Sequence, residues 1–115
     1  MIQIKNLLEF LDGRKVEDIT LLDMREVSPL MDFMVIGTVS NSRLMDATAQ
    51  YLKQYLDEHH QSYYPISKSA DSGWVLVDAK DVVIHLFMQP QRELYNLEKL
   101  WSDCVIDPNS LGNEE

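Results

Sequence analysis

The chain has 115 residues, 45% of them hydrophobic and 25% charged, and its formal net charge is −9. This composition is typical of one globular domain. It excludes a disordered chain. No apolar run approaches the roughly 18 residues of a membrane span, which excludes a membrane-spanning protein. A chain this acidic is repelled by phosphate backbones. We therefore expect little direct nucleic-acid binding, and a basic protein as the better electrostatic partner.

The cysteine content and the N-terminal sequence bear on the compartment. Cys104 is the one cysteine, so it cannot form an internal disulfide and fits a reducing environment. No basic stretch followed by an apolar core is visible at the N-terminus, as a secretory signal would require. We therefore expect a cytoplasmic protein that does not associate with membranes.

The first elements in chain order are a helix and two strands. Apolar residues at helical spacing predict a helix over residues 2–12, which ends near Gly13. A segment rich in Ile, Thr and Leu predicts a strand over residues 18–25, and Ser28-Pro29 marks a turn. The nearly continuous apolar run over residues 32–39 then predicts a strand that is buried on both faces.

The second half of the chain adds a long helix, three strands and a final helix. A 3.6-residue apolar period predicts a helix over residues 42–59, and an edge strand is expected over residues 63–66, which a proline interrupts. The strands over residues 74–78 and 82–87 are too close for a crossover, so they must form an antiparallel hairpin. A last helix is expected from Gln89-Pro90 to about Trp101.

The order of these elements predicts an α/β fold. Helices interleaved with strands, plus one hairpin, indicate a mixed sheet of about five strands that is covered by helices. We expect a single domain over residues 1–102, and a disordered tail over residues 103–115 because that segment is polar and contains a proline and a glycine.

Three acidic residues at strand ends raise the possibility of an enzyme. Asp32, Asp78 and Asp81 could converge on magnesium, as in nucleotidyltransferases that work on mixed sheets. Such enzymes place paired acids two residues apart on one strand and hold the triphosphate in a Gly-Ser turn, and the chain has neither arrangement. We expect Asp78 and Asp81 to shape the hairpin turn instead, and we keep a magnesium-dependent nucleotidyltransferase-like enzyme as the alternative function.

Other chemistry has weak support in the sequence. His85 is a lone histidine in an apolar strand, without a Ser or Cys in a nucleophile-like context, so a satisfied, partly buried histidine is the preferred interpretation. His59 and His60 are adjacent and would point about 100° apart on a helix, so they do not suit one metal ion. We expect no metal, no cofactor and no catalytic residues.

Large aromatic residues are concentrated in the last third of the chain. Trp74, Tyr95 and Trp101 are close in sequence to Arg92 and Glu98. Trp, Tyr and Arg carry most of the binding energy at protein interfaces, so these residues suggest a docking surface. The alternative that both tryptophans belong to the core stays open.

The same region resembles a known family. Asp32 to Thr38 (DFMVIGT), Trp74 to Phe87 (WVLVDAKDVVIHLF), and Arg92 followed by Tyr95 to Trp101 (YNLEKLW) are similar to the signature segments of the ribosomal silencing factor (Iojap-like) family. The resemblance extends over roughly residues 4–102. There are two departures, because Lys80 stands where the family usually has a turn glycine and Gln91 where it commonly has an acid.

The resemblance implies a fold and a function. The fold would be related to nucleotidyltransferases but lack their active site. The protein would bind the large ribosomal subunit through its ribosomal protein number fourteen, at the subunit interface, and repress translation under nutrient limitation by blocking subunit joining. A homodimeric regulatory domain is a third alternative. The signature positions expected to make or support the contact are Trp74, His85, Arg92, Tyr95, Leu97, Glu98 and Trp101.

Overall fold

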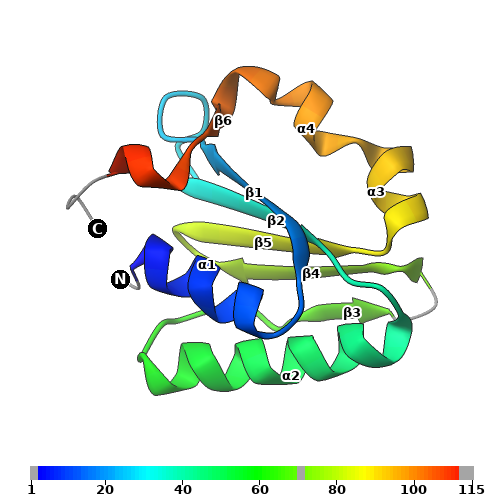
Figure 1. The fold of residues 1–115 in the computed structure, drawn as a ribbon. Helices are drawn as coiled ribbons and strands as arrows, with labels where there is room; N and C mark the ends of the chain where they lie inside the picture. Colours follow the sequence, from blue (N-terminus) through cyan, green and yellow to red (C-terminus); the bar gives the residue numbers. More distant parts are fainter. Residues whose placement is uncertain (1–2, 70–71, 112–115) are drawn as a thin grey trace.

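The centre of the fold is a mixed β-sheet, which a computed structural model describes together with its helices for residues 3–69 and 72–111 (Figure 1). The elements are α1 (Ile4–Gly13), β1 (Glu17–Asp23), β2 (Phe33–Thr38), α2 (Ser42–Glu58), β3 (Ser67–Ser69), β4 (Trp74–Ala79), β5 (Val82–Phe87), α3 (Gln89–Tyr95), α4 (Leu97–Leu100), η2 (Ser102–Cys104), β6 (Val105–Ile106) and η3 (Pro108–Leu111). In these residues the strand order is β3-β4-β5-β2-β1-β6.

The central pair of strands is parallel and the outer pairs are antiparallel. β2 and β5 run side by side from Phe33 opposite Val82 to Thr38 opposite Phe87, and every residue of both strands is buried. A parallel pair needs a long connection, which α2, β3 and β4 provide. The predicted α/β class with a mixed sheet is therefore confirmed, and the two-residue strand β6 adds a sixth strand to the expected five.

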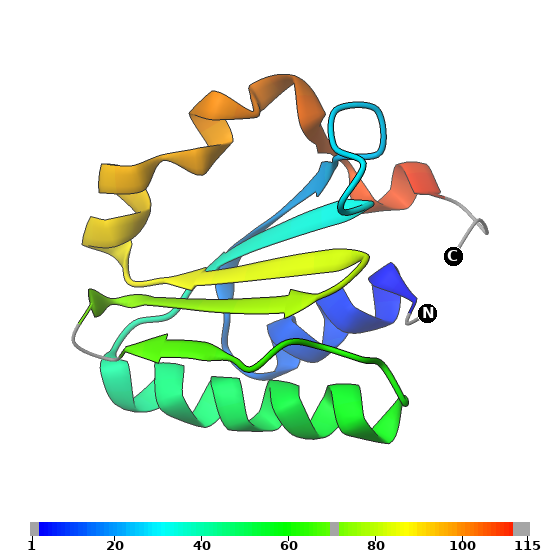
Figure 2. The same ribbon diagram turned by 180° about the vertical axis from the view of Figure 1, so that it is seen from behind.

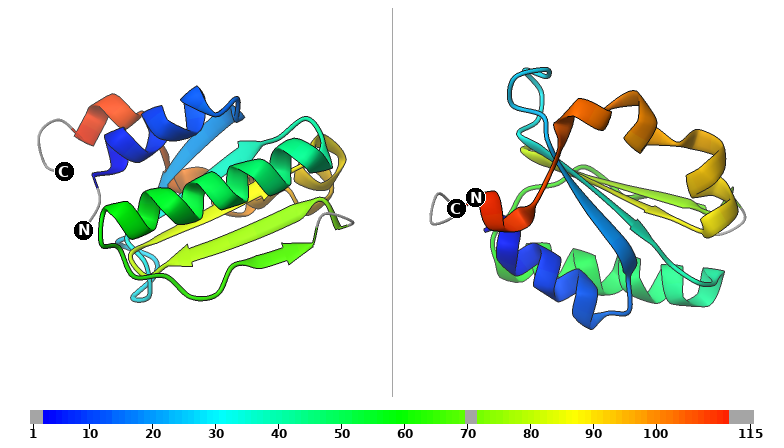
Figure 3. Two further views of the ribbon diagram at one scale, coloured as in Figure 1. Left: turned by 90° about the horizontal axis from the view of Figure 1, so that it is seen from below. Right: turned by 45° about the horizontal axis from the view of Figure 1, so that its top comes forward.

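Helices α1 and α2 cover one face of the sheet (Figures 1 and 3). Alternate strand residues point toward these helices, as the two-residue period of a strand requires, so Val75, Val77, Ile84 and Leu86 join the main hydrophobic core. The side chain of Asn41 caps α2 by accepting a hydrogen bond from the backbone N–H of Leu44 at 2.8 Å.

The segment containing α3 and α4 arches over the opposite face of the sheet (Figures 1 and 2). A second, smaller core lies between this arch and the sheet. Its buried residues are Leu22, Met24, Met34, Ile36, Phe87 and Cys104. Half-buried Met31, Trp74, Leu97 and Trp101 pack against them. Within the described residues, no helix combines the length and the apolar character that crossing a membrane requires.

Two predicted elements differ from the structure, one within the arch and one before β3. The expected single helix to Trp101 is broken at Asn96, whose φ of 44° lies in the left-handed region and ends α3. The edge strand expected over residues 63–66 is wrong, because the strand lies at Ser67–Ser69 instead. Residues 61–66 are irregular, although the Tyr64 N–H still donates to the Asp78 carbonyl at 2.9 Å.

The expected disordered tail is also wrong as far as residue 111. β6 pairs with Leu21 and Leu22 of β1, Cys104 is buried in the second core, and Leu111 is buried in the main core. Two apolar anchors and a short strand are therefore enough to hold a segment that is mostly polar. The rest of the expected tail, residues 112–115, lies outside the described residues, as does residue 2 at the start of the first predicted helix.

Candidate docking face

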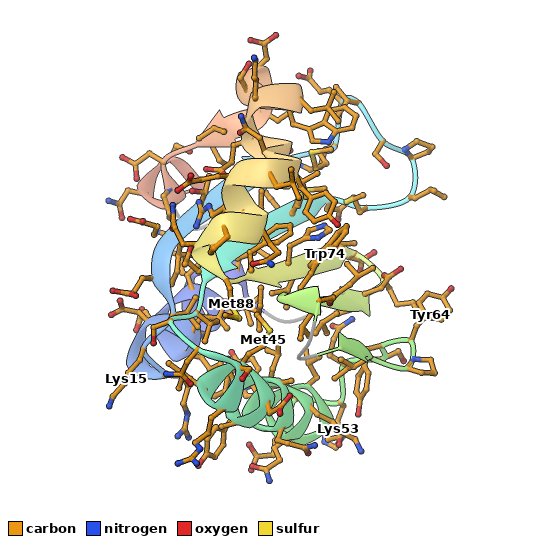
Figure 4. All side chains as sticks on the ribbon, turned by 90° about the vertical axis from the view of Figure 1, so that its right-hand side faces the viewer. Lys15, Met45, Lys53, Tyr64, Trp74 and Met88 are labelled. Carbon is orange, nitrogen blue, oxygen red and sulfur yellow. The ribbon has the colours of Figure 1, made fainter. Side chains whose placement is uncertain are left out.

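The open end of the β4–β5 hairpin carries a cluster of aromatic rings on the face under the arch. Trp74 lies opposite Phe87 in the strand register, and the two rings stack with centroids 5.1 Å apart. His85 precedes Phe87 by two residues and so shares its face, with a ring separation of 6.0 Å. Tyr95 reaches down from α3 to within 4.7 Å of Trp74. These four residues form the ring cluster, and Figure 4 shows Trp74 on the α3 side of the sheet.

His85 is buried like Phe87 in the ring cluster, with 7% of its surface exposed. The indole Nε1–H of Trp74 donates a hydrogen bond to its Nδ1 at 3.1 Å. Burial lowers the pKa of His85 from 6.5 to about 4, so the imidazole is neutral at physiological pH and Nδ1 is free to accept. The residue is therefore a satisfied, buried histidine, as its apolar strand predicts.

Arg92 is the centre of a polar network that ties the arch to the sheet. Its guanidinium forms a bidentate ion pair with the Glu98 carboxylate, in which Nε donates to Oε1 at 3.0 Å and Nη2 donates to Oε2 at 2.9 Å. It also donates to the Asp18 carbonyl at 2.6 Å, to the Thr38 hydroxyl at 2.8 Å and to the Thr20 hydroxyl at 2.9 Å. All five N–H groups of the side chain are therefore used within the protein, which explains how a cation can be 92% buried.

An irregularity in β1 makes this network possible. The pairing of β1 with β2 shifts register between Glu17 and Thr20, and Asp18 inside the shift has a φ of 50°. Such a bulge leaves a residue out of the ladder and redirects its backbone groups. The Asp18 carbonyl, which is released from strand pairing, accepts from Arg92 instead.

Three large apolar or aromatic side chains are exposed on the arch, among polar neighbours such as Glu93 and Lys99. Leu94 is 75% exposed, Tyr95 48% and Leu100 70%. These three residues form the apolar rim. Tyr95 of the rim contacts the half-buried Trp74 of the ring cluster, so we take the rim and the cluster together as a candidate docking face, hereafter the docking face.

An open hollow of about 520 Å³ lies beside the Arg92 network. Its lining is polar and includes Asp18, Gln89, Glu93 and Asn96. Since Arg92 has no spare donor and the other charged lining residues are acids, the hollow does not suit a phosphate or another anion.

The structure brings the seven predicted positions together in three groups. Trp74, His85 and Tyr95 belong to the ring cluster. Arg92 and Glu98 form the ion pair of the polar network. Leu97 and Trp101 pack half-buried against the second core.

Sequence reasoning missed several residues of this region. Leu94 and Leu100 of the rim were missed because an exposed leucine looks like a core residue in an amphipathic pattern. Phe87 was assigned to its strand but not to the cluster. A signal existed for the Arg92 partners, because Thr20 and Thr38 are hydroxyl residues within apolar strands, but nothing local connects them to Arg92.

One of the two acidic residues at the far end of the hairpin, Asp78, serves the turn. The Asp78 carboxylate accepts from the Lys80 backbone N–H at 3.0 Å, which confirms its predicted role there. Lys80 adopts a φ of 70°, the conformation that a glycine takes more easily, and its ammonium lies 3.5 Å from the centre of the Tyr64 ring. In residues 3–69 and 72–111, no group of three or more His, Cys, Asp or Glu side chains could hold a metal ion.

Comparison with known proteins gives the chain relatives over most of its length. The family described as "Ribosomal silencing factor during starvation" matches residues 2–115, which includes the tail that the signature segments leave out. The chain is 37% identical over 101 residues to the ribosomal silencing factor of Bacillus subtilis, covering 88% of this chain and 86% of that protein.

Two further comparisons extend this result. A crystal structure of a protein from Chromobacterium violaceum superimposes with a TM-score of 0.79 at 30% identity, covering 88% of each chain. The mouse protein named "Mitochondrial assembly of ribosomal large subunit protein 1" is 32% identical over 102 residues, covering 86% of this chain and 45% of that protein. From its sequence and its fold alike, the chain belongs to the ribosomal silencing factor family.

Proposed function

We propose that the protein docks on the large ribosomal subunit through its docking face, binds ribosomal protein number fourteen at the subunit interface, and blocks the small subunit from joining. No bond is made or broken in this mechanism. Repression follows from occupancy, because a body with extents of 35 × 33 × 24 Å on a bridging surface excludes a second binder. Translation in the cytoplasm would fall when nutrients are limiting.

The observation that carries this proposal is the exposure of large apolar and aromatic side chains on an arch that is hydrogen-bonded and packed to the sheet. Leu94, Tyr95 and Leu100 face solvent, whereas the Arg92 network and the ring cluster hold the arch that carries them. Preorganised aromatic anchors are what a tight protein interface needs. The net charge of −9 favours a basic partner, and the mouse relative is named for assembly of a large ribosomal subunit.

The alternative, a magnesium-dependent nucleotidyltransferase-like enzyme, gains no support from the described residues. Asp78 is engaged in the hairpin turn, and the backbone carbonyl of Asp81 accepts from the N–H groups of Asp32 and Phe33 at 2.7 and 3.1 Å. We expect nucleotide with magnesium to leave the melting temperature unchanged. A rise would point to a nucleotide site and contradict a purely steric role.

Sedimentation with purified ribosomal particles tests the main proposal. We expect the protein to migrate with isolated large subunits, and not with small subunits or joined ribosomes. Equal retention by joined ribosomes would contradict the steric mechanism. The sedimentation of the protein alone would also separate a monomer from a homodimer.

A matched pair of tyrosines tests the site. Tyr95→Ala should weaken binding to the large subunit by roughly 30- to 1,000-fold, as the loss of a central aromatic anchor does. Tyr64→Ala is the control, because Tyr64 has a similar exposure of 52% but lies beside the other end of β4. Binding that is lost equally in both variants, or in neither, would place the contact elsewhere.

A further inference from the structure

A histidine at position 85 places a polar side chain in a buried, apolar strand, which costs free energy of folding. The other five residues of β5 are Val, Ile, Leu or Phe, and all six are buried. A buried imidazole loses its hydration, which an apolar side chain would not, so the strand gains stability from His85 only if its polar atoms are used. One of them is used, because Nδ1 accepts the indole hydrogen of Trp74 at 3.1 Å.

Trp74 needs such a partner to hold one orientation. The rings of Phe87 and Tyr95 pack against it at 5.1 and 4.7 Å. Ring packing of this kind is not directional, so it tolerates a flip or a slide of the indole within its plane. The indole Nε1–H is a donor only, so an acceptor on one side selects the single flip state that points toward it.

We propose that His85 is a positioning residue of the docking face: its Nδ1 fixes the Trp74 ring in one orientation, so that Trp74 and Tyr95 present a preformed aromatic surface to the partner. His85 is too deeply buried to be a main contact itself. This inference rests on the proposed function and gives the buried histidine a role within it. The ring orientation can nevertheless be tested without a ribosome.

The surroundings of His85 keep Nδ1 available as an acceptor. In the sheet, His85 lies between Ile36 of β2 and Leu76 of β4, neither of which carries a charge. Apart from His85 itself, Tyr95 is the titratable member of the ring cluster, and it carries no carboxylate or amine that could pair with the imidazole. The low pKa that burial gives the imidazole agrees with this picture, since a protonated Nδ1 could not accept the indole hydrogen.

The first test uses the free protein. In ¹⁵N-labelled protein, the indole signal of Trp74 is identified by its loss in Trp74→Phe. We expect this hydrogen to exchange with solvent slowly, and to exchange at least about tenfold faster in His85→Phe, which keeps an aromatic ring but removes the acceptor. His85→Asn, which places an amide oxygen near the Nδ1 position, should restore part of the protection. An indole exchange rate that is the same in the wild type and both variants would overturn the proposal.

The second test is a double-mutant cycle on binding to isolated large subunits. His85→Phe should weaken binding by about 3- to 10-fold in the wild-type background, which is the range for one hydrogen bond. In the Trp74→Phe background the same substitution should change binding by less than about twofold, because no indole remains to be positioned. Equal losses in both backgrounds, or no loss in either, would overturn the proposal.

The two tests separate this inference from the proposed function. A wild-type protein that fails to sediment with large subunits contradicts the proposed function, and the indole exchange rates still decide whether His85 fixes Trp74. Circular dichroism and melting temperature show whether each variant is folded. If His85→Phe does not fold, His85→Leu, which also lacks an acceptor, replaces it in both tests.

Discussion

Arg92 concentrates an unusual amount of hydrogen bonding in one side chain. Its guanidinium connects the bulge of β1, the end of β2 and the helix α4, which are distant in sequence. A planar group with five donors can satisfy this geometry, whereas an ammonium with three donors cannot. The residue therefore holds the arch to the sheet through buried hydrogen bonds, and little of its side chain contacts solvent.

Substituting Arg92 by lysine tests this role. We expect Arg92→Lys to lower the free energy of unfolding by about 1–3 kcal/mol, because at least two of its buried acceptors lose their donor, while the half-exposed Glu98 limits the loss. Arg25→Lys is the control, since the Arg25–Asp23 pair is exposed and should contribute less than about 1 kcal/mol. Urea unfolding of both variants gives the comparison, and equal losses would contradict a special role for Arg92.

His85 makes stability depend on pH. Its pKa is about 4 in the folded protein against 6.5 for the free side chain, so the unfolded chain binds the proton more tightly. The free energy of unfolding should therefore be highest above pH 6.5 and fall as the pH decreases toward 4, by up to about 3 kcal/mol from this residue alone.

The comparison of wild type with His85→Phe isolates this effect. Urea unfolding between pH 7 and 5 should show a decline in the wild type that is steeper than in His85→Phe, which lacks the titrating group. His59, His60 and the carboxylates are present in both proteins and cancel in the difference. Parallel curves would show that the imidazole is not buried in neutral form.

At the scale of elements, two leucines near the end of the chain distinguish a role in core packing from a role in docking. Leu111 of η3 is buried in the main core, whereas Leu100 of α4 is 70% exposed on the apolar rim. We expect Leu111→Ala to lower the free energy of unfolding by about 2–4 kcal/mol, and Leu100→Ala to change it by less than about 0.5 kcal/mol.

Binding measurements should reverse this order. Leu100→Ala removes an exposed side chain of the proposed docking face, so its affinity for the large subunit should fall, whereas folded Leu111→Ala should bind like the wild type. Thermal unfolding and sedimentation on the same two proteins give both values. A Leu111→Ala variant as stable as the wild type would mean that residues 108–111 do not contribute to the core.

The arch itself depends on a single residue in an unusual conformation. Asn96 ends α3 in the left-handed region and lets α4 start in a new direction, so that Glu98 returns toward Arg92 and Leu97 toward the second core. Asparagine tolerates this conformation better than most residues because its short polar side chain can bond locally.

For the whole molecule, charge sets the salt dependence of docking. The formal net charge of −9 should attract a basic ribosomal protein over distances that salt screens. We expect the affinity for large subunits to fall by roughly tenfold between about 50 and 300 mM salt, mainly through slower association. Tyr95→Ala should lower the affinity at every salt concentration without changing this slope, because an uncharged contact is lost. An affinity that rises with salt would indicate a purely apolar interface.

Much of the fold follows from local patterns. The alternation along β5 places Val82, Ile84 and Leu86 on one face and His85 and Phe87 on the other, and the two cores divide in this way. Helical periods located α1 and α2 to within two residues, and the short link between β4 and β5 required a hairpin. Patterns of this kind depend on neighbours within a few residues, so a single chain is enough to read them.

The sequence by itself thus determined the class of fold, most element positions and, through its signature segments, the family. Only the tertiary structure decided which signature residues are buried and hold the arch to the sheet, and which have exposed side chains. Burial depends on contacts between distant residues, such as those of Arg92 with Asp18 and Thr38, which are 74 and 54 positions away in the sequence. Their meeting requires a strand register, a bulge and a broken helix at once. The burial of Leu111 could not be predicted from the sequence either. A single leucine in a polar segment forms no helical or strand periodicity that would indicate a buried face.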